Sequence, residues 1–422
     1  MPSRTGIYCG RLPHRCGVLQ QAPLSRDSVC IARYLSDNRY RTALVGHLNI
    51  IGGHEWAGFQ EAVQHHEDVA AGKSFFSGIA GGKPFFAHVS HGLVHRSYGQ
   101  EYDQELVKRI PVPPVLPDNL TTRRDLASLA LNVTELDRRV GFTLDALDAA
   151  GLTENTLVIF TTDHGVALAR HKHTLYDPGI RTALLMRLPG VIKPESVHDQ
   201  LLSNVDLFPT VCDLAGVPVP NDLDGRSFVT LFKGEAGPMR TSAFAEVNWA
   251  RRGGALCYGP HRCLRTDRYK LIRNFHSEPC YLDGGFVGRY ANDLDVLNNW
   301  PLFGNPCPTH ELYDIVADPW EMANLADDPA HEDALLDLDM ELNKLMEDTG
   351  DPAFHGKVPS QTDEPVKPQW AKGDDGVYRL DYDLETETKE RPFQQDAAAR
   401  NGRGTRSAVP QAFLPEVDDE GY

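Results

Sequence analysis

The chain has 422 residues, 41% of them hydrophobic, which is enough apolar material for one large core or two ordinary ones. Lys and Arg number 42 against 59 Asp and Glu, and the resulting net charge of −17 excludes a broad nucleic-acid-binding surface. No run approaches the roughly 18 consecutive apolar residues of a membrane helix, so a soluble protein without a membrane span is expected.

Short apolar runs alternate with amphipathic segments in the first half of the chain. Residues 25–37 have near-helical apolar spacing, and 41–46 read as a short strand. A second strand is predicted over 84–90. Residues 122–151 repeat apolar side chains every three or four positions, which predicts a long amphipathic helix ended by Gly151. This alternation predicts an α/β fold, with a mostly parallel central sheet covered by helices.

The run from Thr156 to Thr162 is rich in β-branched and aromatic residues and leads directly into Asp163, His164 and Gly165. It predicts a buried strand whose C-terminal tip presents two side chains able to bind a metal. Ligands of open α/β sheets bind at such tips. The alternative is a structural Asp that ends the strand or caps a helix.

Later segments follow a different pattern. Residues 203–216 predict another helix, and after about residue 240 the short runs 268–273 and 311–314 predict a small antiparallel sheet. A last helix over 329–346 is expected to pack on that sheet. From about residue 356 polar residues dominate, as in a loosely ordered extension.

Three regions are therefore predicted: an α/β domain over 1–240, a smaller α+β subdomain over 241–355 and a polar extension over 356–422. The eight cysteines have no Cys-x-x-Cys spacing, which argues against a zinc ribbon and favours reduced, buried thiols. Two pairs could instead form disulfides: Cys257 with Cys263, and Cys280 with Cys307.

Several separated motifs together resemble the type I sulfatases of the alkaline phosphatase superfamily. They are Met1-Pro2-Ser3-Arg4 with Gly10-Arg11, the segment 153–160, and Leu175-Tyr176-Asp177-Pro178-Gly179. The last two are most similar to the heparan N-sulfatase-like (sulfamidase) branch. The resemblance implies an alkaline-phosphatase-like fold and a metal-dependent hydrolase of sulfuric esters or sulfamates, with a small-molecule or saccharide sulfate as substrate.

The family signature is a Cys or Ser that is oxidised to formylglycine, followed by x-Pro-Ser-Arg. Here the match begins at the second position, so the formylglycine is expected one place before Met1. The family's first strand, which supplies an Asp-Asp pair to the metal, does not precede it. Either the true start lies upstream, which is our expectation, or the chain is a degenerate copy without a nucleophile. As it stands, the chain is expected to be inactive.

The resemblance assigns roles to residues of this chain. Arg4 would hold the formylglycine, and Asp163 and His164 fall on the family's metal pair, with one divalent cation, most simply Ca²⁺, as the cofactor. Lys172 would contact the sulfate, and His95 would protonate or orient the leaving group.

One motif departs from the family pattern. Where the family usually has Gly-Lys-x-His, this chain has Gly46-His47-Leu48-Asn49. His47 would replace the lysine and Asn49 the histidine, which removes a permanent charge and a proton-transfer group. His88 and His91 are expected to be packing groups of the strand and the loop, although His91 could substitute for His95.

Two other functions remain open. A phosphonate monoester hydrolase or phosphodiesterase of the same superfamily would share the Asp-His-Gly strand tip. A non-catalytic pseudoenzyme would keep the pocket and bind sulfated ligands without hydrolysing them. The sequence specifies neither the substrate nor the oligomeric state.

Overall fold

A computed structural model describes residues 2–19, 28–48, 53–63, 76, 78, 82–96, 98, 102–234, 239–252, 255–276, 307–356, 358, 370–372 and 378–380. The chain divides into two units, Met1–Pro368 and Gln369–Tyr422. The second contributes one antiparallel strand pair, β10 (Trp370–Lys372) and β11 (Tyr378–Leu380). Of the predicted extension, Gly356 and the buried Val358 are also described, and its other residues lie outside the described ones. The boundaries expected near residues 240 and 355 remain predictions.

A three-stranded parallel sheet lies in the first unit. Its central strand β1 (Arg41–Val45) pairs with β2 (Glu61–Val63) on one edge and β3 (Phe85–Val89) on the other. Four of the five β1 residues are buried, as expected for a strand with neighbours on both edges. The strands predicted at 41–46 and 84–90 are thus confirmed, and so is the parallel sheet.

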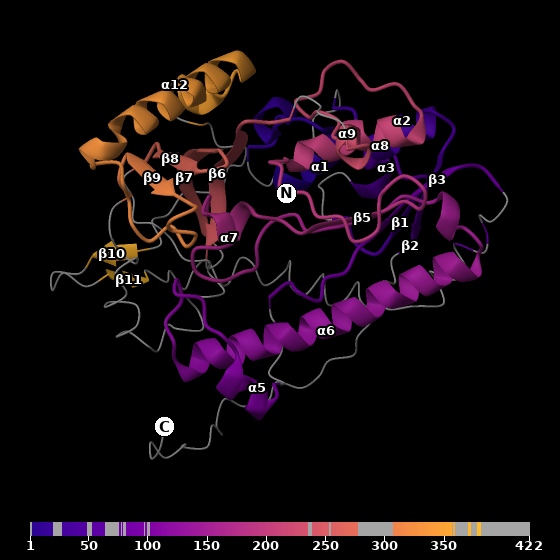
Figure 1. The fold of residues 1–422 in the computed structure, drawn as a ribbon, viewed down its shortest axis with the longest axis horizontal. Helices are drawn as coiled ribbons and strands as arrows, with labels where there is room; N and C mark the ends of the chain where they lie inside the picture. The colour runs from indigo at the N-terminus through magenta and orange to yellow at the C-terminus, as the bar shows by residue number, and fades with distance from the viewer. Residues whose placement is uncertain are drawn as a thin grey trace. The chain divides into compact units, whose positions relative to one another are not determined.

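Helices cover both faces of this sheet (Figure 1). Buried residues of one face, such as Leu44, pack with Tyr8 and Phe208 of helices on that side. On the other face Ala43 packs with Ala146 and Leu147 of the long helix α6. The helices on the Leu44 side are α1 (Pro2–Cys9), α2 (Ile31–Asp37), α3 (Gly53–Ala57) and α8 (Leu207–Ala215).

Helix α6 spans Leu120–Ala149, close to the predicted range, and the chain leaves it through Gly151 with a φ of 69°. The Asn119 side chain caps its first turn by accepting from the Thr122 amide. Its burial differs from a continuous apolar stripe, because both ends are buried while Val133 in the middle is 48% exposed.

The central run forms a shorter and less buried strand than predicted. β4 (Val158–Thr161) pairs antiparallel with β5 (Leu184–Arg187), and in the part of the chain that the structure describes it has no second neighbour. All four of its residues are only half-buried. The expectation of a buried strand is therefore wrong, because a strand paired on one edge keeps part of its surface exposed.

The predicted C-terminal sheet is confirmed, with four antiparallel strands in sequence order. Leu264, Leu271 and Leu312 lie opposite one another and pack against α12 (Glu332–Thr349), the predicted last helix. The other face packs on the segment around Tyr176. The strands are β6 (Ala243–Arg252), β7 (Ala255–Arg265), β8 (Tyr269–Asn274) and β9 (His310–Asp314).

Short elements complete the described chain, and none of its helices is long and apolar enough to cross a membrane. Cys307 is disulfide-bonded, whereas five buried cysteines are free thiols. The short elements are η1 (Pro13–Cys16), α5 (Gln104–Arg109), η2 (Thr153–Asn155), α7 (Asp177–Ile180), η3 (Asn204–Asp206), α9 (Val229–Phe232), η4 (Pro329–His331) and η5 (Pro352–Phe354).

Candidate active site

The first helical turn of α1 contacts the loop that follows β4. Pro2 suits the first helical position because it has no amide hydrogen to satisfy there. The Ser3 hydroxyl donates to the carbonyl oxygen of Asp163, and Arg4 Nη2 lies 3.1 Å from Asp163 Oδ2. Two consecutive residues of α1 thus fix the backbone and the carboxylate of the predicted metal ligand.

Asp163 and His164 form a close pair, with His164 Nε2 3.4 Å from Asp163 Oδ2. Burial alone would raise the pKa of Asp163, but the positive charge that His164 can take up at acid pH and the Arg4 guanidinium outweigh burial and hold that pKa below its usual range. Burial lowers the pKa of His164 by more than the Asp163 carboxylate raises it, and the Lys172 ammonium lowers it further. The pair therefore consists of a carboxylate and a neutral imidazole near pH 7.

The hydrogen bonds of His164 fix its tautomer. Nδ1 lies 2.7 Å from the carbonyl oxygen of Gly165, so it must donate, which leaves a lone pair on Nε2 beside the Asp163 carboxylate. Two ligands at right angles around a divalent cation, each about 2.3 Å from it, would be about 3.3 Å apart. The spacing of Asp163 Oδ2 and His164 Nε2 therefore suits two ligands of one cation. Arg4 also pairs with Asp163 Oδ2, and among the described residues no third His, Cys, Asp or Glu lies close enough to complete a group of three ligands.

Lys172 and His95 meet at the other end of the site. Lys172 Nζ lies 3.5 Å from His95 Nε2. His95 Nδ1 is 2.5 Å from the carbonyl oxygen of Arg96 and must donate to it, so Nε2 presents its lone pair to the ammonium. An exposed imidazole and a cation thus stand side by side, a pair that suits the binding of an anionic group.

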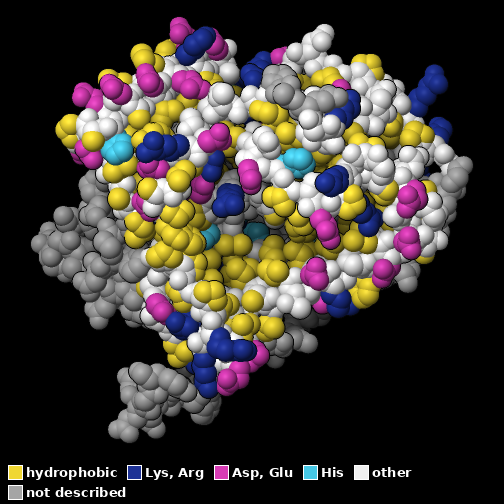
Figure 2. All heavy atoms as spheres, viewed as in Figure 1, with side chains coloured by type: hydrophobic (Ala, Val, Ile, Leu, Met, Phe, Trp, Pro, Cys, Tyr) yellow, Lys and Arg dark blue, Asp and Glu magenta, His cyan; other side chains and the backbone are white. Residues whose placement is uncertain are grey.

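Two glycines allow the loop between β4 and β5 to fold tightly. The Gly165 amide donates to the carbonyl oxygen of Gly179 at 2.9 Å. A Cβ on Gly165 would lie 1.8 Å from the carbonyl oxygen of Pro178, and one on Gly179 would lie 2.4 Å from that of His171. Only glycine permits this approach, which explains the glycine after Asp163 and His164. Figure 2 shows a hollow near the middle of the displayed face of the molecule, with a largely hydrophobic floor and with basic, acidic and histidine side chains at its edge.

The structure thus brings together five of the six predicted site residues in two contacting groups, Arg4 with Asp163 and His164, and Lys172 with His95. The Lys172 ammonium is near enough to His164 to lower its pKa. The sixth, His47, is exposed at the end of β1, and its backbone amide donates to Ser90 Oγ at 2.7 Å. Asn49 lies outside the described residues.

The two further histidines of the β3 region differ in environment. Desolvation and the charges of Arg4 and His91 lower the pKa of His88 to about 4, so its imidazole is neutral and packs near Tyr8 and Phe59. This agrees with its predicted packing role. His91 is half-buried beside it.

Sequence reasoning missed two groups that touch the site. Ser3 was treated only as part of a motif, yet it binds the Asp163 backbone. Asp125 is buried inside α6, where it pairs with Arg96. Its position one place before Leu126 puts a carboxylate at the edge of the apolar stripe, and that is the signal that could have revealed it.

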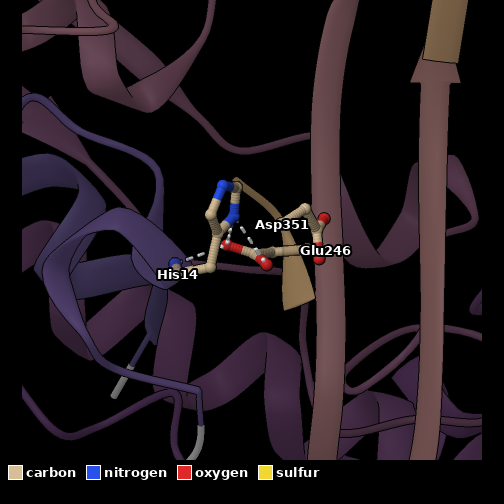
Figure 3. A group of neighbouring side chains, drawn as sticks. All are labelled: His14, Glu246 and Asp351. Carbon is tan, nitrogen blue, oxygen red and sulfur yellow. Dashed lines mark hydrogen bonds and ion pairs between the residues drawn. The ribbon is translucent and has the colours of Figure 1, made fainter. Parts of the chain in front are cut away.

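A separate group of possible metal ligands lies between the N-terminal segment and the C-terminal sheet (Figure 3). His14, Glu246 and Asp351 offer ligand atoms within 4.8 Å of one another. Arg262 already fills the cation position, because its guanidinium binds both oxygens of Asp351 and lies 3.7 Å from Glu246 Oε2. His14 Nδ1 is 3.1 Å from both Glu246 oxygens. The group is thus a buried network of ion pairs.

This network predicts a pH-dependent stability. Burial alone would lower the pKa of His14, but the Glu246 carboxylate has the larger effect and raises it. Burial alone would raise the pKa of Glu246, but His14 and Arg262 have the larger effect and lower it. The His14 contribution is present below its unfolded pKa of about 6.5 and is lost as pH rises through the folded pKa. The Glu246 contribution is present above about pH 4.3 and is lost as pH falls.

We therefore expect His14→Gln to lower the free energy of unfolding by about 3 kcal/mol near pH 5.5. The difference from the unsubstituted protein should shrink as the pH is raised to about 8.5. Urea unfolding at several pH values measures it, and His198→Gln, at an exposed position, serves as the control. A difference that is the same at both pH values would contradict a charged His14.

Two models of known protein families match stretches of this chain that contain residues of the candidate site. The family model described as "Sulfatase" matches residues 1–217, which is half of the chain. The chain belongs to the sulfatase family. A second family model, for the C-terminal part of N-sulphoglucosamine sulphohydrolase, matches residues 165–282. The predicted resemblance to type I sulfatases is confirmed.

Two curated relatives and one solved structure illustrate the similarity. An ulvan-active sulfatase of Formosa agariphila is 31% identical over 261 residues, covering 57% of this chain and 41% of the relative. Human N-sulphoglucosamine sulphohydrolase is 30% identical over 264 residues, covering 57% and 51%. The chain thus spans about half the length of these relatives. A phosphonate monoester hydrolase from Silicibacter pomeroyi shares the fold, with a TM-score of 0.61, 20% identity and 90% of each chain covered.

Proposed function

We propose that this chain carries part of the active site of a sulfatase that hydrolyses sulfate esters or sulfamates on saccharides. The observation that supports it best is the presence of two contacting groups, Arg4 with Asp163 and His164, and Lys172 with His95, with the Lys172 ammonium near enough to lower the pKa of His164. Each group includes a cation, which suits a sulfate anion. The names of the two curated relatives point to sulfated saccharides as the substrate class.

Three residues of the chain would have separate roles, set by their charge and their protonation. Lys172 would hold a sulfate oxygen and stabilise the charge that develops during sulfuryl transfer. In its imidazolium form, with Nδ1 still donating to Arg96, His95 would give the proton on Nε2 to the departing alkoxide or amine and return to the neutral Nδ1-protonated tautomer. Arg4 would orient the nucleophile side of the site, next to the Asp163 carboxylate.

Asp163 and His164 would hold a divalent cation, for which calcium is the family expectation. A bound cation would polarise a sulfate oxygen. The carboxylate suits calcium, whereas the imidazole is a less usual ligand of that ion. The formylglycine of the family would stand before Pro2, on the side of Asp163 that Ser3 and Arg4 already touch.

The test begins with the protein purified from its native source. Peptide mapping around Pro2 would detect formylglycine by mass. Release of inorganic sulfate is then measured from N-sulfoglucosamine, from glucosamine 6-sulfate and from ulvan oligosaccharides, in parallel with hydrolysis of a phosphonate monoester. Formylglycine with sulfate release would support the proposal.

Two other outcomes of this test would each support a different function. Faster hydrolysis of the phosphonate monoester than of any sulfate would replace the sulfatase with a phosphonate monoester hydrolase or phosphodiesterase. Binding of sulfated sugars without turnover, in a protein that lacks formylglycine, would identify a pseudoenzyme.

A further inference from the structure

We propose that Arg96 and Asp125 are positioning residues that hold His95 and Lys172 in register with each other. The inference rests on the proposed function for its catalytic meaning. Its structural part, that one buried ion pair fixes two loops, can be tested without any turnover.

The Arg96 guanidinium binds three parts of the protein at once. Nη1 and Nη2 donate to the two carboxylate oxygens of Asp125 on α6, at 3.1 and 2.7 Å. Nε and Nη2 also donate to the carbonyl oxygen of Ala167, at 3.0 and 2.6 Å. The side chain lies over Tyr98, with Cζ 4.6 Å from the ring centroid.

These contacts join the segment of His95 to the loop of Lys172. Arg96 follows His95 directly, and its carbonyl oxygen accepts a hydrogen bond from the protonated Nδ1 of His95. Ala167 belongs to a turn in which the Val166 carbonyl oxygen accepts from the Lys172 amide at 3.1 Å. A shift of the guanidinium would therefore move both members of the 3.5 Å contact between Lys172 and His95.

Burial makes this clamp stiff. The Asp125 side chain is 1% exposed and that of Arg96 is 10% exposed. A planar, bidentate guanidinium fixes direction as well as distance, which a lysine ammonium cannot do. The buried carboxylate within the long helix α6 is thus accounted for: it anchors the arginine to a rigid element.

The clamp predicts a definite His95 tautomer in the unsubstituted protein. Nitrogen-15 spectra of histidine-labelled protein at about pH 8.5, where an ordinary histidine is neutral, should show His95 protonated on Nδ1. In Arg96→Lys and in Asp125→Asn we expect a mixture of the two tautomers. A His95 protonated on Nε2 in the unsubstituted protein would overturn the proposal, whether or not the variants fold.

Activity gives the second readout. Arg96→Lys should lower kcat for sulfate release about tenfold to hundredfold, with KM changed by less than about twofold, because misplacement acts on the reacting groups. The matched control is Arg262→Lys, since Arg262 also binds a buried carboxylate and backbone carbonyl oxygens but lies in the C-terminal sheet. It should leave both the tautomer and kcat unchanged in folded protein.

The two readouts separate the two proposals. If the unsubstituted protein releases no sulfate, the proposed function fails while the tautomer ratio still decides the clamp. If folded Arg96→Lys and Asp125→Asn keep the single tautomer, Arg96 and Asp125 are merely structural and the inference is wrong.

Discussion

Replacing Lys172 with Met is expected to lower kcat for sulfate release about 10²–10³-fold, which corresponds to about 2.7–4 kcal/mol of transition-state stabilisation. Met keeps the length of the side chain and removes the ammonium, the cation that stands 3.5 Å from His95 Nε2. The loss should appear mainly in kcat if Lys172 meets charge that develops during the reaction, and mainly in KM if it only binds the sulfate.

Lys193→Met is the control, because Lys193 is an exposed lysine after β5. It should leave kcat and KM unchanged. Equal activity of the Lys172 and Lys193 variants would remove Lys172 from the active site. If the Lys172 variant loses kcat but binds inorganic sulfate as tightly as the unsubstituted protein, Lys172 acts in the reaction itself and not only in binding.

Much of the fold could be predicted because its signals are local. Periodicity located α6, and the Ser203 and Asp206 capping box with Gly216 bounded the helix segment predicted after residue 200. The antiparallel pairing of β4 and β5 could not be predicted in this way. Strand direction depends on how distant segments pack, and an apolar run reads the same whichever way its neighbour points.

The site shows the same division. Asp163, His164, Lys172 and His95 could be proposed as site residues because motifs carry them in short stretches of sequence. The link between Arg96 and Asp125 joins residues 29 positions apart, and each looks ordinary by itself. Only the fold brings α6 under the loop that follows β3. Motifs therefore identify the groups of a site, whereas the groups that position them come from tertiary contacts.

Replacing Lys270 with Met is expected to lower the free energy of unfolding by about 3–5 kcal/mol, because it leaves the buried Glu321 carboxylate without its counter-ion and Asp177 with Arg265 as its remaining ion-pair partner. Lys270 is fully buried on β8 and forms ion pairs with Asp177 and Glu321, the latter at 2.7 Å. Its ammonium also donates to the carbonyl oxygen of Leu175 at 3.2 Å. The C-terminal sheet thus holds the end of the loop that carries Lys172.

Urea unfolding checks this expectation, with Lys344→Met as the matched control. Lys344 also pairs with a carboxylate, that of Asp348, but both side chains are exposed, so its removal should change the free energy of unfolding very little. Burial already raises the pKa of Glu321, and loss of the Lys270 ammonium would raise it further. Protonation would then relieve the buried charge, so the deficit of Lys270→Met should narrow as the pH falls. If Lys270→Met proved as stable as Lys344→Met, the Lys270 ion pairs would not be what fixes this loop, and the orientation of Lys172 would depend on other contacts of the loop, such as that of Arg96 with Ala167.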